Sequence, residues 1–295
     1  MPLRQTEDLP DHPAIDAVGP DMAADMMLDG QVAAVRAVAG ARAAITQAAK
    51  AMADRVASGG TLIYAAAGSS GLMALADVCE LPATFGIPTN QLRLHMAGGV
   101  PTGGHMPGQT EDDTAEADKI AAAITKNDCL IALSASGSTP YPVAIAQKTA
   151  ARGAMVIGIA NNPDTPLLNA ADIAICIQTP PEVLAGSTRL GAGTAQKVVL
   201  NMMSTLMGVR LGHVYQGRMV NLIADNAKLQ TRAAAIVCDI TRVPLDKARV
   251  ALETAQGNVK LAVLIASGFD PIQAHEALTE HKGHLGPCLT NSDQN

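Results

Sequence analysis

The sequence predicts an α/β fold: a doubly wound, five-stranded parallel sheet with N-terminal helices and a C-terminal helical region. Five short apolar runs, bounded by glycine or polar residues, have the composition of strands that are buried on both faces. Helical segments lie between most of these runs, and strands that alternate with helices at this spacing form parallel sheets. After Arg189 the strand pattern ends and only helical segments follow.

The N-terminal part is predicted to begin with helices. Residues 21–58 are rich in alanine and contain no proline, which indicates one or two long helices that end at Gly59 and Gly60. The predicted strands follow at residues 61–67, 92–97, 129–135, 155–160 and 173–178, with helices between them at residues 71–81, 111–126 and 140–152.

The C-terminal part is predicted to be helical throughout. Its helical segments, separated by breaks that contain glycine or proline, are residues 192–211, 217–237, 244–256, 257–267 and 271–281. We expect a main domain of residues 1–242, which includes the N-terminal helices, and a small helical domain of residues 243–295 with a loose tail from His284.

Charge and composition exclude two classes of protein. A net charge of −6, 2% aromatic residues and no tryptophan do not fit a general nucleic-acid binder, which needs a positive surface and stacking platforms. No apolar run reaches the ~18 residues of a membrane span, and the N-terminus does not have the pattern of a signal peptide. The five cysteines are odd in number and widely spaced, so we expect reduced core thiols in a cytoplasmic protein.

Two loops rich in glycine and hydroxyl residues follow predicted strands and lead into helices. Small residues let the backbone approach a ligand, and a helix N-terminus with nearby hydroxyls favours an anion. For either loop alone, ordinary helix capping is the better explanation, but two such loops on one sheet favour a phosphate site. Neither loop has the pattern of an ATP or NAD site, so a small phosphorylated sugar is the expected ligand. The candidate residues are Ser69, Ser70 and Gly71 of the first loop (66–71), and Ser134, Ser136, Gly137, Ser138 and Thr139 of the second (134–139).

Two glutamates are candidates for acid and base. Glu80 falls on the apolar stripe of Leu72, Ala76 and Cys79, where burial and the nearby Asp77 are expected to favour its protonated form, as a general acid requires. The alternative is a carboxylate at a helix end that reaches solvent.

The second candidate, Glu111, is expected in a first helical turn after an N-cap at Thr110, where the helix dipole favours the ionised form of a base. Ordinary capping by acidic residues is the alternative. His105 lies in the loop before it and is a weaker candidate for contact with substrate. His275, His281, His284 and Cys288 do not have the spacing of a usual metal site, so no metal is expected.

Several motifs resemble a known family. SASGST followed by Pro-Tyr, together with AAGSSG, resembles the sugar isomerase (SIS) domain. EVLAGSTRLGAGTAQKVVLNMMST (182–205) is similar to the signature of the N-acetylmuramic acid 6-phosphate etherases. ELPATFG, the TEDD turn, LGHVYQGRMVNL and GNVKLAVL extend the resemblance to residues 45–285.

The resemblance implies a cytoplasmic homodimer without a cofactor that cleaves the lactyl ether of N-acetylmuramic acid 6-phosphate, in peptidoglycan recycling. The products would be N-acetylglucosamine 6-phosphate and D-lactate. Its two family glutamates match Glu80 as acid and Glu111 as base, and by analogy Ser70, Ser134, Ser136 and Thr139 would hold the phosphate.

The sequence also departs from the family. Leu72, Ser138 and Gly191 stand where relatives usually have Arg, Arg and Lys, and Asp8-Leu9-Pro10 replaces an Arg-Asn element after Thr-Glu. Because arginine usually clamps carboxylates and phosphates, the pocket is expected to be less cationic. A non-catalytic sugar-phosphate regulator and an aldose–ketose phosphate isomerase are therefore kept as alternatives.

Overall fold

The sheet has the predicted architecture. The computed structural model describes residues 5–9, 11–107 and 109–290. Five parallel strands follow the order β2-β1-β3-β4-β5. Their bounds agree closely with the predicted runs: β1 is Leu62–Ala66, β2 Leu92–Met96, β3 Cys129–Ser134, β4 Met155–Ala160 and β5 Ile173–Cys176. The prediction of a doubly wound α/β fold is confirmed.

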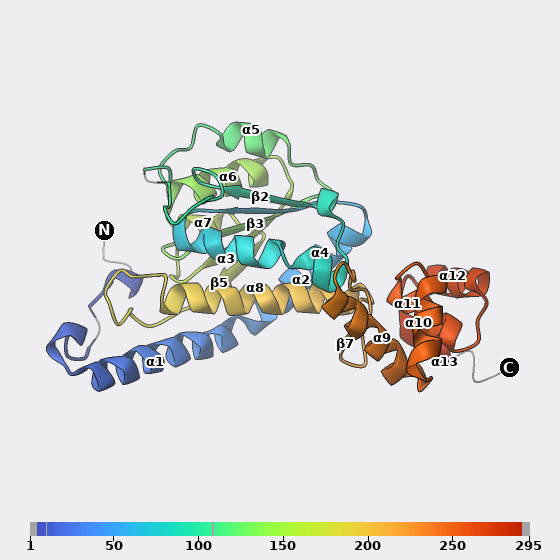
Figure 1. Ribbon diagram of the computed structural model, residues 1–295. Helices are drawn as coiled ribbons and strands as arrows, with labels where there is room; N and C mark the ends of the chain where they lie inside the picture. The colour runs from blue at the N-terminus through green and yellow to red at the C-terminus, as the bar shows by residue number, and fades with distance from the viewer. Residues whose placement is uncertain (1–4, 10, 108, 291–295) are drawn as a thin grey trace. The chain divides into compact units, whose positions relative to one another are not determined.

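Burial explains why the central strands are uniformly apolar. Every residue of β1 and of β3 is buried, because helices cover both faces of the sheet. The edge strand β2 is more exposed and tolerates Arg93 and His95. Figure 1 shows α5 (Ala117–Ala122) and α6 (Pro140–Ala151) on one face of the sheet and α3 (Gly68–Val78) on the other.

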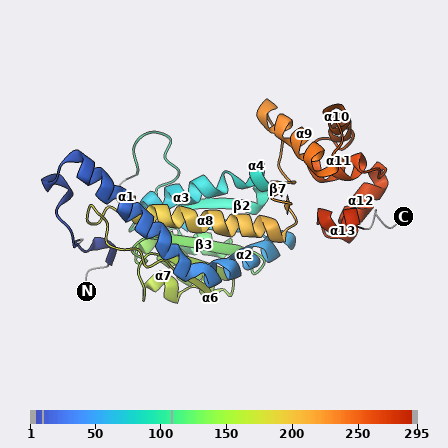
Figure 2. The same cartoon turned by 90° about the horizontal axis from the view of Figure 1, so that it is seen from below.

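The N-terminal helices lie on the same side of the sheet as α3 (Figure 1). Helices α1 (Pro20–Ala37) and α2 (Arg42–Ala57) are joined by the 3-10 turn Val38–Ala41, as the prediction of one or two helices allows. Helix α2 contacts β1, β3 and β5. In Figure 2, α1 crosses the beginning of α8 (Gly191–Arg210), and a Cβ built on Gly191 would lie 3.1 Å from the Cβ of Ala34.

Two predicted helices have different bounds. The helix expected over 71–81 begins earlier, at Gly68, directly after the strand. The helix expected over 111–126 covers only Ala117–Ala122, so that prediction was wrong for residues 111–116 and 123–126. The reason is local: the Thr110 hydroxyl donates to the Pro107 carbonyl (3.3 Å), and the Asp113 carboxylate accepts from Ala115 N (2.8 Å). These bonds favour a turn over a helix start.

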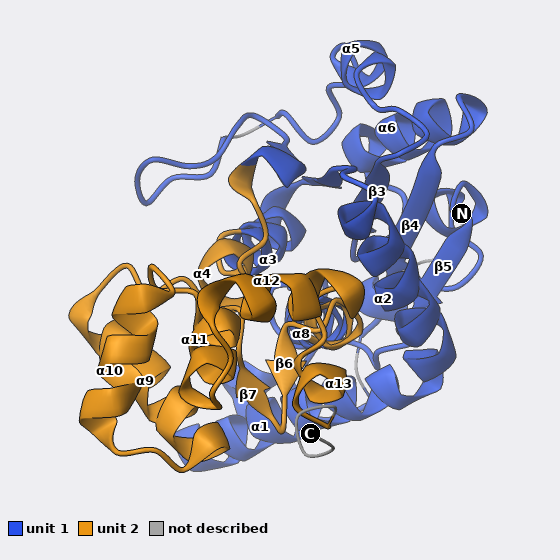
Figure 3. Cartoon of the chain, turned by 90° about the vertical axis from the view of Figure 1, so that its right-hand side faces the viewer, with its two compact units in different colours: residues 1–78, 90–204 blue, residues 79–89, 205–295 orange. Residues whose placement is uncertain are grey.

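The described chain divides into two compact units, coloured separately in Figure 3. The first consists of residues 1–78 and 90–204, and contains the sheet. The second consists of residues 79–89 and 205–295, so the sequence boundary expected at residue 242 falls inside it. Independent folding of residues 243–295 stays a prediction.

The second unit contains two features that the sequence did not predict. A short hairpin, β6 (Val214–Tyr215) with β7 (Arg218–Met219), occupies the beginning of the helix expected over 217–237. The tail expected to be loose forms α13 (Leu285–Thr290), in which Leu285 and Cys288 are buried, while residues 291–295 lie outside the described residues. The other helices are α4 Leu81–Phe85, α9 Ala227–Thr241, α10 Leu245–Thr254, α11 Val259–Ala266 and α12 Pro271–Glu280.

A half-buried histidine is expected to make the second unit sensitive to pH. Burial, and secondarily the Lys260 ammonium, lower the pKa of His213 from 6.5 to about 4. Between these values the unfolded chain binds a proton that the folded chain does not, so the free energy of unfolding falls as the pH is lowered. We expect a loss of about 2 kcal/mol between pH 7 and pH 4.5, measured by urea unfolding.

The control for this effect is a second histidine of the same unit. His213→Gln should remove most of the loss, whereas His275→Gln, at an exposed position, should keep it. Equal pH dependence in the two variants would contradict the assignment.

Two further expectations concerned membrane spans and cysteines. Among the described helices, none combines the length and apolarity that a membrane span requires. All five cysteines are free. Cys129 and Cys288 are buried and Cys176 and Cys238 half-buried, but Cys79 is exposed, so the expectation of core thiols was wrong there.

Candidate functional site

The first loop turns directly from β1 into α3. Gly68 has φ +53°, the left-handed conformation that glycine adopts without strain. Ser69 is half-buried and Ser70 is buried. Gly71 packs closely, because a Cβ there would lie 2.8 Å from the Met96 Cε at the end of β2. The structure thus places the three candidate residues of this loop in the first turn of α3.

The second loop is organised around one hydroxyl. Ser134 Oγ lies 2.8 Å from Thr139 Oγ1 and 3.3 Å from Ser136 Oγ, and it accepts from Gly137 N at 3.0 Å. Ser136 Oγ in turn accepts from Ser138 N (3.2 Å) and Ser138 Oγ (3.1 Å). All five candidate residues of this loop therefore belong to one hydrogen-bonded network. Gly137 has φ +70°, which explains the glycine.

The two loops leave the sheet side by side. Ala66 and Leu133 are register partners in the parallel pairing of β1 with β3, so both strands end at the same edge. Helix α3 then covers one face of the sheet and α6 the other (Figure 1). Ligands of doubly wound sheets bind at this kind of switch point, beyond the carboxyl ends of the strands.

Glu111 bridges the two loops. Its carbonyl accepts a hydrogen bond from Tyr141 N (3.0 Å), in the first turn of α6. A Cβ built on Gly68 would lie only 2.6 Å from the Glu111 Oε1, so the carboxylate rests against the first residue of α3. The prediction that Glu111 lies in the first turn of a helix of its own was wrong, because that helix begins at Ala117; the carboxylate lies beside the first residue of α3 instead.

Glu80 has a different environment from the one predicted. Leu72, Ala76, Cys79 and Glu80 are all exposed, so the expected apolar stripe is not the buried face of α3. Glu80 is the N-cap residue of α4, without a side-chain capping bond, and belongs to the second unit.

The buried face of α3 carries Asp77 instead. The Asp77 carboxylate accepts from Tyr64 Oη (2.9 Å) and Ser204 Oγ (3.1 Å). Burial first, and the Asp77 charge second, hold the pKa of Tyr64 well above its usual value. The Asp77 carboxylate is thus bonded within the core between β1 and α8.

A cavity that sequence reasoning missed adjoins the turn of Glu111. It measures about 300 Å³ and is lined in part by His95, Thr110, Asp113, Glu116 and Tyr141. Burial and Arg93 lower the pKa of His95, while burial and the carboxylates of Glu116 and Asp113 raise that of Tyr141. The polar residues of the edge strand were the only signal in the sequence.

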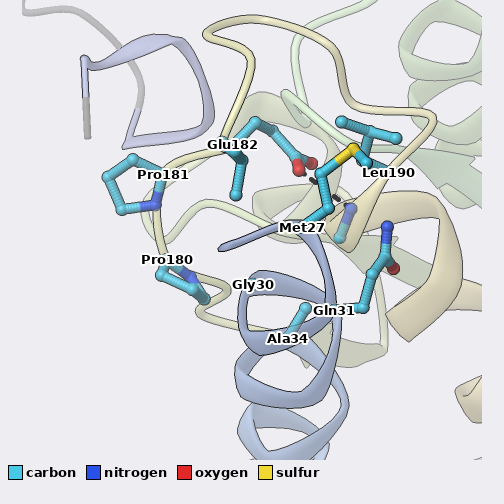
Figure 4. A pocket seen from close by; sticks show the side chains of 10 residues that line it. Met27, Gly30, Gln31, Ala34, Pro180, Pro181, Glu182 and Leu190 are labelled. Atoms are coloured by element: carbon cyan, nitrogen blue, oxygen red, sulfur yellow. Dashed lines mark hydrogen bonds between the residues drawn. The ribbon is translucent and has the colours of Figure 1, made fainter. Parts of the chain in front are cut away.

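A buried carboxylate fixes the beginning of α8. Glu182 is 3% exposed, and its two oxygens accept from Gly191 N and Ala192 N, each at 2.8 Å. Figure 4 shows it in a small pocket beside Met27 and Gln31 of α1. Burial raises the pKa of Glu182, and the two backbone bonds oppose that rise. Glu182 thereby orders the segment between β5 and α8.

The remaining residues singled out in the sequence are dispersed. His105 is exposed in its loop. Of the three positions where cations were expected, Leu72 is 37% exposed, Ser138 is exposed in the second loop, and Gly191 is buried under α1. In the described part of the chain, no three His, Cys, Asp or Glu side chains form a group able to hold a metal ion.

Comparison with known proteins agrees with the fold. Residues 105–206 match the family model described as the SIS domain. A Bacteroides fragilis protein described as a phosphosugar isomerase involved in capsule formation has a similar fold, with a TM-score of 0.52 and 20% identity. That similarity covers 68% of this chain and 95% of the other, and it concerns the fold alone.

Closer relatives share nearly the whole length. A Deinococcus radiodurans protein named N-acetylmuramic acid 6-phosphate etherase is 40% identical over 290 residues, covering 97% of this chain and 95% of its own. A Bacillus licheniformis protein named N-acetylmuramic acid 6-phosphate etherase 2 is 37% identical, covering 97% and 98%. With its SIS domain and its hydroxyl-lined loops, the chain belongs to the N-acetylmuramic acid 6-phosphate etherase family.

Proposed function

We propose that this protein cleaves the lactyl ether of N-acetylmuramic acid 6-phosphate, yielding N-acetylglucosamine 6-phosphate and D-lactate. One observation carries the proposal beyond family membership: the carboxylate of Glu111 lies against the first loop while its backbone is bonded to the helix that follows the second. This position supports Glu111 as a base beside two loops that are suited to a phosphate.

The second loop is the proposed phosphate site. Ser134, Ser136, Ser138 and Thr139 concentrate hydroxyls before α6, whose N-terminus contributes its dipole. These hydroxyls bond to one another in the structure, and each rotates readily to donate to a phosphate oxygen. Ser69, Ser70 and Gly71, in the adjacent first turn of α3, complete the proposed site.

The proposed reaction has two stages. Glu111 removes the C2 proton of the open-chain aldehyde, the C3–O bond breaks with the electron pair going to the lactyl oxygen, and Glu80 protonates that oxygen. Water then adds its hydroxyl to C3 and a proton returns to C2, which gives the amino sugar phosphate. No cofactor takes part. Glu80 is exposed at the beginning of α4, so it is accessible to a substrate.

We also propose a cytoplasmic homodimer. Helix α1 supports the dimer, since it bears the apolar residues Met22, Leu28, Val32 and Val35, which are exposed at 38–62% of their surface. Five free cysteines support a reducing compartment. Peptidoglycan recycling is the corresponding process.

The test is lactate release from N-acetylmuramic acid 6-phosphate by the purified protein. Release by the wild type, strongly reduced in Glu80→Gln, supports the proposal. A ketose phosphate formed from a plain 6-phospho aldose, without lactate release from the ether, would indicate an isomerase instead. Binding of sugar phosphates with no turnover of either substrate would indicate a regulator.

Ser136→Ala is expected to abolish stabilisation by phosphorylated sugars. A ligand at 100 times its Kd stabilises the folded state by about 2.7 kcal/mol, which raises the melting temperature of the wild type by a few degrees. Ser136 contacts both Ser134 and Ser138, so its loss breaks the link between them in the hydroxyl network. Thermal shift with glucose 6-phosphate measures this effect.

Ser58→Ala is the matched control, because the Ser58 hydroxyl only donates to the Arg55 carbonyl at an exposed helix end. Its ligand-induced shift should equal that of the wild type. An undiminished shift in Ser136→Ala would place the phosphate elsewhere.

A further inference from the structure

The N-terminal turn of the first unit is bonded to Asn162 through one buried residue, Thr6. Thr6, in the 3-10 turn Gln5–Glu7, is 0% exposed although both neighbours are exposed. Asn162 Nδ2 donates to Thr6 Oγ1 at 3.0 Å, and Thr6 N donates to Asn162 Oδ1 at 3.4 Å. The side-chain amide of Asn162 is thus paired on both sides with a residue 156 positions away in sequence.

The same amide supports the second loop. Asn162 Nδ2 also donates to the carbonyl of Ala135 at 3.0 Å, and the backbone N–H of Asn161 donates to that carbonyl at 3.0 Å. Ala135 lies between Ser134 and Ser136, the two hydroxyl residues at the centre of the loop. Asn162 is 1% exposed, so its orientation depends on the partners it has inside the protein.

The other side of the turn contacts the segment that precedes α8. A Cβ built on Gly186 would lie 2.8 Å from the Glu7 Oε2. The turn therefore lies between the second loop, which it reaches through Asn162, and the segment ordered by Glu182. The turn is more than an incidental surface contact, because Thr6, whose hydroxyl bonds Asn162, is fully buried.

We propose that Thr6 is a positioning residue for phosphate binding. Its hydroxyl and N–H hold the Asn162 amide in the orientation that bonds Ala135 O, and this fixes the backbone that carries Ser134 and Ser136. The inference rests on the proposed function only in taking the second loop as the phosphate site. Thr6 contacts neither the reacting carbons nor Glu111 in this scheme, so its effect falls on binding.

Thr6→Val keeps the shape of the side chain and removes its hydrogen bond. We expect KM for N-acetylmuramic acid 6-phosphate, and Kd for glucose 6-phosphate measured by calorimetry, to rise about 3- to 10-fold, as the loss of one hydrogen bond predicts. kcat should stay within about 2-fold of the wild type. Thr6→Ser, which keeps the hydroxyl, should restore both constants.

The matched control is Thr149→Val. Thr149 is also 0% exposed in the first unit, but its hydroxyl has no hydrogen-bond partner among the described residues. This variant should leave KM and Kd unchanged. Thr6→Ala, which only removes atoms, replaces Thr6→Val if the latter does not fold.

Two results would overturn the role of Thr6: an unchanged Kd in the folded Thr6 variant, or an equal rise in Thr149→Val. Failure of the proposed function is a separate result. If the wild type binds glucose 6-phosphate but releases no lactate, the etherase proposal fails, while the comparison of Kd values still decides the role of Thr6.

Discussion

Glu111→Gln is expected to lower kcat for lactate release by about 10²–10⁴-fold, the range that a positioned general base contributes. The amide keeps the size of the side chain and its contact with Gly68, but it does not accept the C2 proton. Because the backbone bond from Tyr141 is unaffected, the turn should keep its place and sugar phosphates should bind as in the wild type. Stopped assays of D-lactate measure the rate.

Asp112→Asn is the control for this variant, since it removes a charge from the next residue of the same turn, which is also exposed. It should retain most of the wild-type rate. Comparable rate losses in the two variants would indicate that the rate depends on the charge of the turn. They would contradict a role of Glu111 as proton acceptor.

Gly68→Ala is expected to lower kcat by about 10²-fold with little loss of phosphate affinity. The added Cβ would lie 2.6 Å from the Glu111 Oε1, closer than atoms of neighbouring side chains approach, so the carboxylate must move. A displacement of about 1 Å at a reacting group is enough for a rate loss of this size. Lactate release and the Kd for glucose 6-phosphate are measured together.

Gly59→Ala is the control that separates the effect of the contact with Glu111 from the effect of backbone strain. Gly59 has φ +81° and Gly68 has φ +53°, so alanine is strained at both positions and each variant should lose about 1 kcal/mol of stability. Only Gly68 has an atom of Glu111 nearby, whereas nothing lies within 4 Å of a Cβ at Gly59. Equal kcat in Gly68→Ala and Gly59→Ala would show that Glu111 is not displaced.

The sheet and its two loops were predictable because their signals are local. Strands buried on both faces must be continuous apolar runs, as in β1 and β3, and loops at their ends must be small and polar where helices begin. The N-terminal helices followed from composition alone. The hairpin at residues 214–219 was not predictable in this way, because strands of two residues leave no periodic pattern.

The environments of the two glutamates depended on tertiary contacts. The exposed stripe of α3 is as apolar as its buried face, which bears Asp77, so the pattern placed Glu80 on the wrong side. The acidic turn at Glu111 has the sequence of a helix start, but bonds from Thr110 and to Asp113 close a turn instead. The proximity of Glu111 to Gly68, more than forty positions earlier, has no local signature.

In the proposed reaction, the bond between Tyr141 N and the Glu111 carbonyl sets the distance between the base and the phosphate site. It joins the base to the helix whose first turn closes the phosphate site, so the span from phosphate to base is set by the fold and not by the substrate. A sugar phosphorylated at C6 would present C2 at the far end of this span. A sugar phosphorylated at C1 would present a different carbon, and its lactyl ether would survive even when the phosphate is bound.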